Sequence, residues 1–309
     1  MKAVTIHSFG GPEVLQLENL PIPEPAEGQV LVRVHAASVN PVDWKTREGK
    51  YPAVGADRLP LVLGRDIAGH IERCGPGVHG FAVGDAVYAM LDREHGGYAE
   101  YVIVSAGDLA AKPGRLEYTG AAAVPLAAIT AWQGLFDHGQ LHSGQHVLIH
   151  GGAGGVGHLA VQLAKARGAR VSTVVSAQDA GFVRSLGADE VIDYQHERFE
   201  ERVHDVDLVF DLINGETQDR SWQVLKRGGA LISTLRKPSE ERARSLGARA
   251  ANYQAQPNAA ELDAVGRLID ENRVRPHVER VFPLEQAREA QQLQQNGHLR
   301  GKVVLEVLH

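Results

Sequence analysis

The residues best suited to chemistry lie in a glycine-rich segment, HGGAGGVG, at positions 150–157. Gly152, Gly154 and Gly157 fit the pattern G-x-G-x-x-G. The pattern follows a short apolar run and opens a stretch with helical spacing, which is the context that a dinucleotide site requires. In such a site the first glycine permits a sharp turn, the second lets the backbone approach a pyrophosphate, and the third allows close helix–strand packing. Backbone amides at the helix start would bind the anion.

The residue after the next apolar run, RVSTVV, bears on which dinucleotide is bound. An NAD site usually carries an acid there, about 20 residues beyond the glycines. This chain has Ser176, and a hydroxyl suits a 2′-phosphate that an acid would repel, so the sequence favours NADPH. Asp179 follows closely, and no Lys or Arg comes immediately after Ser176. Ser is also a preferred helix N-cap residue, so Ser176 could serve either purpose or both.

Alternating strand and helix patterns surround these residues after Ala121. The spacing predicts an α/β fold, a doubly wound parallel sheet with helices between its strands. We expect a helix over 216–225 to be closed by the pair Gly228–Gly229, and a weaker sixth strand near 249–254. The other strands are expected at residues 145–150, 170–175, 190–194, 206–212 and 230–235, and the other helices at 155–167 and 180–186.

The two ends of the chain have a different pattern. Before Ala121, short β-like runs alternate with Gly- and Pro-rich turns, which indicates a β-rich domain. After a helical stretch at 259–270 come HVERVF, a helix at 284–294 and KVVLEVL, which has no helix after it. We expect this tail to return to the β-rich domain and complete its sheet. The predicted domains are therefore 1–121 with 259–309, and 122–258.

Length and composition limit the class of protein. A chain of 309 residues is long enough for two domains. Its net charge of −6 and lack of a basic stripe argue against a nucleic-acid partner. The single cysteine, Cys74, excludes an intramolecular disulfide and fits a reducing compartment. The most apolar stretch, 120–135, is too short and interrupted to span a membrane, and no signal peptide is evident, so we expect a cytoplasmic protein.

Several co-linear motifs together resemble the medium-chain dehydrogenase/reductase superfamily, in its zinc-independent quinone oxidoreductase-like (zeta-crystallin-like) branch. The resemblance implies a GroES-like β domain built from both chain ends, a Rossmann domain between them, a coenzyme held in the cleft, and a homodimer joined through the Rossmann sheets. The matching segments are NPVDWKTREG at 40–49, LPLVLGRDIAGHIERCGPGV at 59–78, GDAVYAM at 84–90, GGYAEYVIV at 96–104, AAVPLAAITAWQGL at 122–135, HGGAGGVG at 150–157, SLGADEVIDY at 185–194, DLVFDLINGET at 207–217 and RGKVVLEV at 300–307.

The resemblance allows a residue-by-residue test for zinc. Asn40 stands where the alcohol dehydrogenase branch has a cysteine, and Arg65–Asp66 stand where it has a His–Glu pair. Zinc requires thiolate, imidazole or carboxylate ligands, which Asn40 and Arg65 cannot supply. We therefore expect no metal site.

The family's coenzyme contacts carry over to a small set of positions. Relatives often have a basic residue where this chain has Gln178, which weakens the expected preference for NADPH. The resemblance implies that Gly154, Gly155 and Val156 offer amides to the pyrophosphate, that Ser176 and Tyr194 flank the 2′-phosphate, that Thr130 lies near the nicotinamide ribose, and that Arg300 approaches the coenzyme.

The chemistry expected without a metal is hydride transfer to a quinone or an α,β-unsaturated carbonyl. Negative charge then develops on oxygen and needs hydrogen-bond donors. Asn40 could line this site and Tyr51 could donate a proton, since a tyrosine hydroxyl ordinarily keeps its proton at neutral pH. Equally, Asn40 could be a turn residue before Pro41, and Tyr51 could be core packing. The alternatives to a quinone or enone reductase are an enoyl reductase of a biosynthetic pathway and a coenzyme-binding protein with little turnover.

Overall fold

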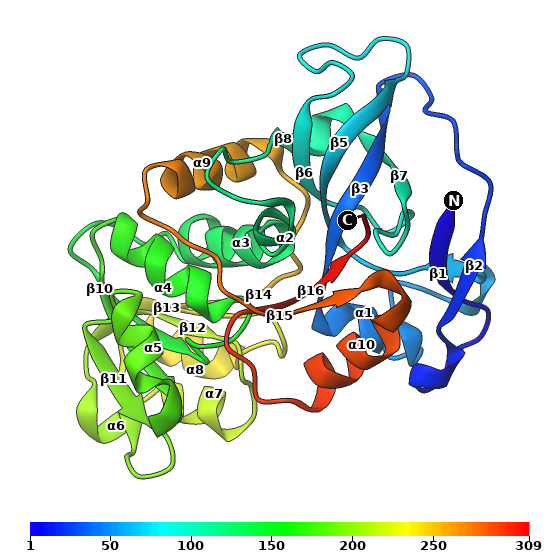
Figure 1. The fold of residues 1–309 in the computed structure, drawn as a ribbon. Coiled ribbons are helices and arrows are strands. Elements are labelled where there is room, and N and C mark those ends of the chain that lie inside the picture. Colours follow the sequence, from blue (N-terminus) through cyan, green and yellow to red (C-terminus); the bar gives the residue numbers. More distant parts are fainter. Residues whose placement is uncertain (309) are drawn as a thin grey trace. The chain divides into compact units, whose positions relative to one another are not determined.

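The computed structural model describes residues 1–308, which divide into two compact units. Unit 1 contains residues 1–126, 257–270 and 276–308, and unit 2 contains residues 127–256 and 271–275. Unit 1 is therefore built from both ends of the chain, and unit 2 from its middle (Figure 1).

Unit 2 contains the expected parallel sheet. Its six strands run in the order β11-β10-β9-β12-β13-β14, and every neighbouring pair is parallel. This order confirms the doubly wound class, including the weakly signalled last strand. The strands are β9 (His146–His150), β10 (Arg170–Val175), β11 (Glu190–Asp193), β12 (Val206–Asp211), β13 (Leu225–Ser233) and β14 (Arg249–Asn252). The helices are α3 (Pro125–Trp132), which begins in unit 1, α4 (Gly157–Ala166), α5 (Ala180–Ser185), α6 (Phe199–Arg202), α7 (Glu216–Ser221) and α8 (Glu240–Leu246), with a π-helical segment at Gln133–His138.

Apolar side chains cover both faces of this sheet. Successive residues of a strand point to opposite faces, so neighbouring residues belong to different clusters. Val174 and Ile192 belong to the apolar cluster that includes residues of α6 and α8. Their neighbours Val175 and Val191 belong to the cluster of α5. The near-continuous apolar strands of the sequence follow from burial on both faces.

One expected element was wrong. The helix predicted over 216–225 ends at Ser221, and β13 begins already at Leu225. Gly228 and Gly229 therefore lie inside a strand, where the register between β12 and β13 shifts, instead of closing a helix. Gly228 takes a φ of 78°, so the glycine pair supplies a bulge rather than a helix end.

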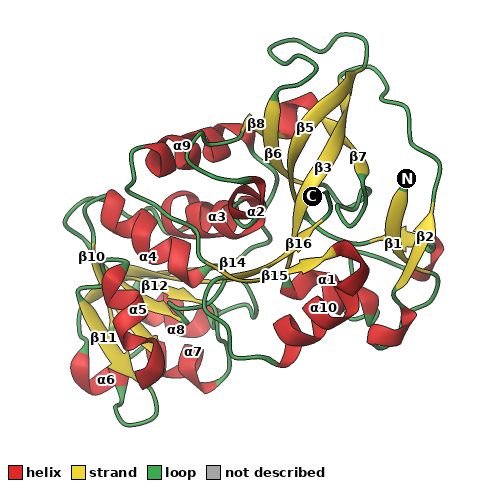
Figure 2. Ribbon diagram, in the orientation of Figure 1, coloured by secondary structure: helices red, strands yellow, loops and turns green. Residues whose placement is uncertain are grey.

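Unit 1 contains two β-sheets. In the larger, β16 pairs antiparallel with β3 and parallel with β15, so the tail completes the N-terminal sheet as predicted (Figures 1 and 2). The orders are β15-β16-β3-β5-β6-β8, with β7 also on β3, and β2-β1-β4. The strands are β1 (Lys2–Ile6), β2 (Gln16–Asn19), β3 (Gln29–Val39), β4 (Leu61–Val62), β5 (Asp66–Cys74), β6 (Ala86–Met90), β7 (Tyr101–Ser105), β8 (Leu109–Ala111), β15 (Val278–Pro283) and β16 (Lys302–Glu306), and the helices are α1 (Pro41–Arg47), α2 (Tyr118–Ala122), α9 (Ala259–Asp270) and α10 (Ala287–Asn296).

A buried arginine joins the tail helix to the N-terminal part of unit 1. Arg47, at the end of α1, is fully buried and donates to the side chain of Gln291 at 2.7 Å and to the carbonyl of Gly10 at 3.2 Å. A buried guanidinium requires such partners, because an unpaired one would carry a large desolvation cost. The pairing of α1 with α10 is thus fixed by polar contacts as well as by apolar packing.

The helices of the described residues give no membrane-spanning candidate. None is both long enough and apolar enough to cross a bilayer.

The core of unit 2 contains a buried histidine. His150, at the end of β9, is fully buried, and its Nε2 lies 2.8 Å from the hydroxyl of Ser221. Burial lowers the pKa of His150 to about 4, because the imidazolium would lose its hydration.

His150 should make the stability of the protein fall at acid pH. Between pH 6.5 and 4 the unfolded chain takes up a proton that the folded chain refuses, so the free energy of unfolding decreases as pH falls. His150→Gln, which can still bond Ser221 but cannot ionise, should reduce the stability difference between pH 7.5 and pH 5 by about 2 kcal/mol. Urea unfolding at the two pH values measures this, with the exposed His142→Gln as control. An identical pH dependence in His150→Gln would contradict the assignment.

Candidate functional site

The glycine segment forms a tight connection between β9 and α4. Gly151 takes a φ of 79°, a conformation that side chains rarely adopt, so it makes the sharp turn that the sequence analysis assigned to Gly152. Gly152 is required for a different reason. A Cβ there would lie 2.1 Å from the hydroxyl of Thr173 on the neighbouring strand.

The other glycines of the pattern divide into one packed and one open position. A Cβ at Gly157 would lie 2.1 Å from the carbonyl oxygen of Gly151, which confirms the close helix–strand approach expected there. A Cβ at Gly154 would meet nothing closer than the Gly151 oxygen at 3.5 Å. The chain therefore leaves space over Gly154, where a ligand can reach the backbone.

Two amides at the start of α4 are available to an anion. The amide of Gly154 donates to the carbonyl of Gly151 at 3.1 Å. The amides of Gly155 and Val156 have no acceptor among residues 1–308. Unpaired amides and the positive end of the helix dipole both favour a bound phosphate. Two of the three predicted pyrophosphate contacts are thus open to a ligand, and the third is engaged in the turn.

The adjacent strand ends bring the predicted 2′-phosphate residues together. The amide of Tyr194 donates to the carbonyl of Val175, directly before Ser176, and the Tyr194 ring is 59% exposed. Ser176 takes the N-cap position of a short 3₁₀ turn, and its hydroxyl donates to the carboxylate of Asp179 at 2.8 Å. Ser176 thus occupies the N-cap position without a side-chain cap bond, its hydroxyl bonds a buried carboxylate, and its contact with a 2′-phosphate stays a prediction.

Thr130 lies in the second half of α3 and is 8% exposed. Its carbonyl accepts a hydrogen bond from the hydroxyl of Tyr253, just beyond β14. This contact fixes the backbone of Thr130 within unit 2.

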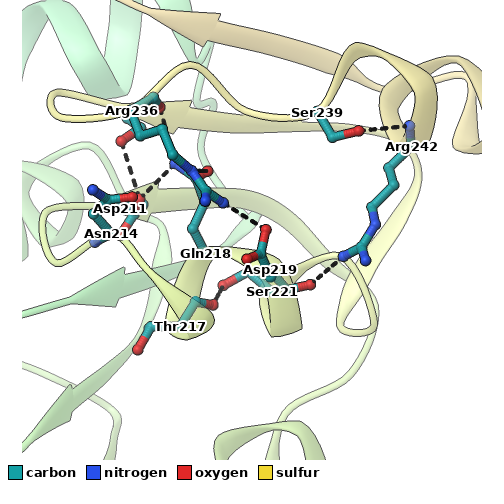
Figure 3. Close-up of polar contacts among 10 residues, drawn as sticks. Asp211, Asn214, Thr217, Gln218, Asp219, Ser221, Arg236, Ser239 and Arg242 are labelled. Carbon is teal, nitrogen blue, oxygen red and sulfur yellow. Dashed lines mark hydrogen bonds and ion pairs between the residues drawn. The ribbon is translucent and has the colours of Figure 1, made fainter.

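A hydrogen-bonded cluster that the sequence analysis did not identify joins the ends of β12 and β13 (Figure 3). The buried carboxylate of Asp211 accepts from the amide of Asn214 at 2.9 Å and from Gln218 at 2.9 Å. Gln218 also donates to the carbonyl of Arg236, whose guanidinium bonds back to Gln218 at 3.0 Å and to Asp219 at 2.5 Å. The two loops are therefore held together at the same sheet edge as the glycine segment.

Two exposed apolar side chains lie on these loops. Ile213 is 54% exposed and Leu235 is 44% exposed. Ile213 also lies against the glycine segment, since a Cβ at Gly151 would be 3.0 Å from its terminal carbon. The signal in the sequence was an apolar residue two positions after each polar strand end, in DLI and STL.

In unit 1, Asn40 belongs to a buried polar network. Its side-chain oxygen accepts a hydrogen bond from the ammonium of Lys302, and its amide donates to Asp66 at 2.8 Å. Lys302 lies 3.5 Å from the same Asp66 oxygen, and Ser38 donates to that oxygen at 2.5 Å. Asn40 is only 3% exposed, so the structure favours a positioning role over that of a free donor.

A second buried carboxylate completes this network. Asp43 accepts from the backbone amide of Asn40 at 2.8 Å and from the hydroxyl of Tyr98 at 2.9 Å. Burial raises the pKa of Asp43 to about 7, against the opposing effect of these hydrogen bonds. Burial likewise lowers the pKa of Lys302, although Asp66 counteracts it.

Tyr51 lines a small pocket of unit 1 and is half-buried. The guanidinium of Arg93 lies 6.0 Å from the centre of its ring. Arg300 lies in the loop before Gly301, also in unit 1. The structure therefore assigns Asn40, Tyr51 and the predicted coenzyme contact Arg300 to unit 1 and the other predicted coenzyme residues to unit 2, and their roles stay predictions.

The donor set around Asn40 is poorly suited to a metal ion. The oxygens of Asn40 and Asp66 already contact the Lys302 ammonium, and Arg65, which directly precedes Asp66 in the sequence, adds a second positive charge. A metal cation at this place would be repelled by these positive charges. Among residues 1–308, no three His, Cys, Asp or Glu side chains form a metal-binding cluster elsewhere.

Comparison with known proteins decides the family. The family model "Alcohol dehydrogenase GroES-like domain" matches residues 26–114, and "Zinc-binding dehydrogenase" matches residues 186–305. The mitochondrial NAD(P)H oxidoreductase RTN4IP1 of Danio rerio is 34% identical over all of this chain and 92% of its own length. The chain belongs to the quinone oxidoreductase-like branch of the medium-chain dehydrogenase/reductase superfamily. Membership confirms the resemblance and the fold class expected from the sequence.

Other members of the family extend the comparison. The chloroplastic NADPH-dependent alkenal/one oxidoreductase of Arabidopsis thaliana is 36% identical over 99% of this chain and 79% of its own. The structure of the quinone oxidoreductase from Coxiella burnetii has a TM-score of 0.91 and is 38% identical, covering 100% of this chain and 99% of its own. The Escherichia coli quinone oxidoreductase complexed with NADPH has a TM-score of 0.89 and is 27% identical, covering 99% of this chain and 100% of its own.

A methyl group at the packed glycine should disrupt the anion-binding turn. Gly157→Ala forces the start of α4 away from the Gly151 carbonyl, so coenzyme affinity should fall at least about tenfold and stability by roughly 1–3 kcal/mol. The matched control is Gly181→Ala in α5, where a Cβ meets nothing within 4 Å and the φ is ordinary. Fluorescence titration with NADPH and thermal unfolding measure the two effects. Equal coenzyme affinity in the two variants would disprove the packing argument.

Proposed function

We propose that the protein is an NADPH-dependent oxidoreductase that reduces quinones or α,β-unsaturated carbonyl compounds. The observation that carries the proposal is the pair of unpaired amides, Gly155 and Val156, beneath the open space over Gly154. Such a cradle fits a pyrophosphate, and the exposed Ile213 and Leu235 at the same sheet edge offer an apolar surface to a nicotinamide ring.

The coenzyme preference rests on the end of β10. No acid directly follows this strand, and the Ser176 hydroxyl and the Tyr194 ring lie there together. Asp179 is the opposing feature, because its carboxylate lies 2.8 Å from the Ser176 hydroxyl. The names of the relatives, which include an NADPH-dependent alkenal/one oxidoreductase and an NADPH complex, support NADPH over NADH.

The chain's own residues suit a reduction without a Lewis acid. When bound, NADPH supplies the hydride. Tyr51 contributes a hydroxyl that can donate a proton to the reduced product, in a pocket lined on one side by apolar residues. Asn40, Asp66 and Lys302 hold the start of α1 in place, so that Tyr51 in the following loop has a fixed anchor. Their contribution is positioning.

Steady-state kinetics test the proposal. The wild-type protein should oxidise NADPH with 1,4-benzoquinone or a 2-alkenal, and NADH should give a kcat/KM lower by roughly tenfold. Tyr51→Phe should lower kcat by about 10²-fold while leaving NADPH binding unchanged. Tyr101→Phe, a half-buried tyrosine on β7, is the matched control.

The possible outcomes separate the alternative functions. Turnover of enoyl thioesters in preference to quinones and alkenals would indicate an enoyl reductase of a biosynthetic pathway. Tight NADPH binding without acceptor-dependent oxidation would indicate a coenzyme-binding protein with little turnover. No affinity for either coenzyme would overturn the proposal.

We also propose that the protein is a homodimer joined through its Rossmann sheets. In the single chain, β14 is an edge strand of the six-stranded sheet, and an edge strand offers unpaired backbone groups to a second copy. Light scattering should then give twice the chain mass of 33.4 kDa. A cytoplasmic location stays a prediction, because relatives include proteins named as mitochondrial and chloroplastic.

A further inference from the structure

The pocket around Tyr51 is lined by several basic side chains. Its free volume is about 30 Å³, and its wall includes Arg65, Arg93 and His95 beside apolar residues such as Val54 and Leu61. A site needs only about 10–15 Å³ to hold one water. The pocket therefore has room for a group of two or three heavy atoms, such as a carboxylate.

Arg65 is the unpaired charge of this pocket. Its Nε donates to the carbonyl of Leu91 at 2.9 Å, which fixes the direction of the side chain. Its two terminal nitrogens make no hydrogen bond or ion pair with any of residues 1–308. These terminal nitrogens are therefore available to form charge-assisted hydrogen bonds to an anion that enters the pocket.

Arg93 is held at the same pocket by its surroundings. Its guanidinium lies over the ring of Tyr51, with 6.0 Å between the guanidinium carbon and the ring centre. Its carbonyl accepts from the guanidinium of Arg58 at 3.3 Å, which joins the loop of Arg93 to the segment that follows Tyr51. The two arginines are therefore presented by two separately anchored segments.

The acids near the pocket are engaged by other groups than Arg65. Asp43 lines the pocket, but it is 2% exposed and committed to the Asn40 amide and the Tyr98 hydroxyl, and burial raises its pKa to about 7. Asp92 accepts from two amides of its own loop and lies 3.0 Å from the ring nitrogen of His95. Neither of these acids forms an ion pair with Arg65.

We propose that this pocket binds a carboxylate of the substrate, so that the protein reduces enones or quinones that carry an acidic group in preference to neutral ones. The inference rests on the proposed function, because it names the substrate class of that reaction. Arg65 supplies two parallel N–H donors in the geometry that a carboxylate accepts, and Arg93 supplies further charge.

The test compares two electrophiles that differ only in charge, (E)-4-oxo-2-pentenoic acid and its methyl ester. The wild-type protein should show a kcat/KM for the acid roughly tenfold above that for the ester. This preference opposes intrinsic reactivity, since an ester withdraws electrons from the alkene more strongly than a carboxylate does. Arg65→Met should lose the preference while retaining turnover of the ester, and Arg65→Lys should retain part of it.

Matched controls keep folding and charge effects apart from recognition. Arg73→Met removes an exposed arginine of the same unit that pairs with Glu24, and it should leave the acid-to-ester ratio unchanged. Arg93→Met should lower the ratio, by less than Arg65→Met. A wild-type ratio below one, or a ratio unchanged in Arg65→Met, would overturn the carboxylate site.

An equilibrium measurement separates this inference from the proposed function. Calorimetric titration with 4-oxopentanoate, which cannot be reduced at an alkene, should show binding to wild-type protein that weakens roughly tenfold in Arg65→Met. Binding of this probe without turnover of either electrophile would support the carboxylate site and contradict the reductase. Turnover of the ester without binding of the probe would support the reductase and contradict the carboxylate site.

Discussion

A buried ammonium–carboxylate pair holds unit 1 together. Lys302 is 4% exposed and Asp66 is fully buried, and the ammonium lies 3.5 Å from a carboxylate oxygen of Asp66. Lys302 begins β16, the strand contributed by the C-terminal tail, whereas Asp66 begins β5 and Asn40 follows β3. Breaking such a pair by removing one partner typically costs about 3–5 kcal/mol, because the remaining charge is left uncompensated. The same contact therefore closes the sheet and fixes the start of α1.

This pair also bears on whether the unit could hold a metal ion. The resemblance to the alcohol dehydrogenase branch implies metal-ligand positions at Asn40 and Arg65, and the Lys302 ammonium bonds to the side-chain oxygen of Asn40. A fixed positive charge from the chain itself thus occupies oxygens that would otherwise be available to a cation. The proposed role of Asn40 is therefore to position the start of α1, and the proposed proton donor is Tyr51.

Unit 2 has a different structural feature, which is that it exposes backbone amides to a ligand. The turn at Gly151 and the packing at Gly157 bring α4 against β9, and they leave the amides of Gly155 and Val156 without protein acceptors. The cluster of Asp211, Gln218 and Arg236 holds the neighbouring loops, so that Ile213 and Leu235 can stay exposed without collapsing into the core. Exposed apolar surface is stable there because the loops that carry it are restrained by hydrogen bonds (Figure 3).

The sequence by itself determined the class of fold, the glycine segment and most strands of unit 2, because these depend on local patterns. Alternating apolar runs and helix starts can be recognised from the types and spacing of neighbouring residues. Only the tertiary structure decided that Gly151, and not Gly152, makes the sharp turn, that Gly228 and Gly229 lie within β13, and that Asn40 is bonded to Lys302. The physical reason is distance along the chain. Residues 40 and 302 meet only because β16 pairs with β3. The spacing of neighbouring residues in the sequence cannot predict a contact between the two ends of the chain that depends on this strand pairing.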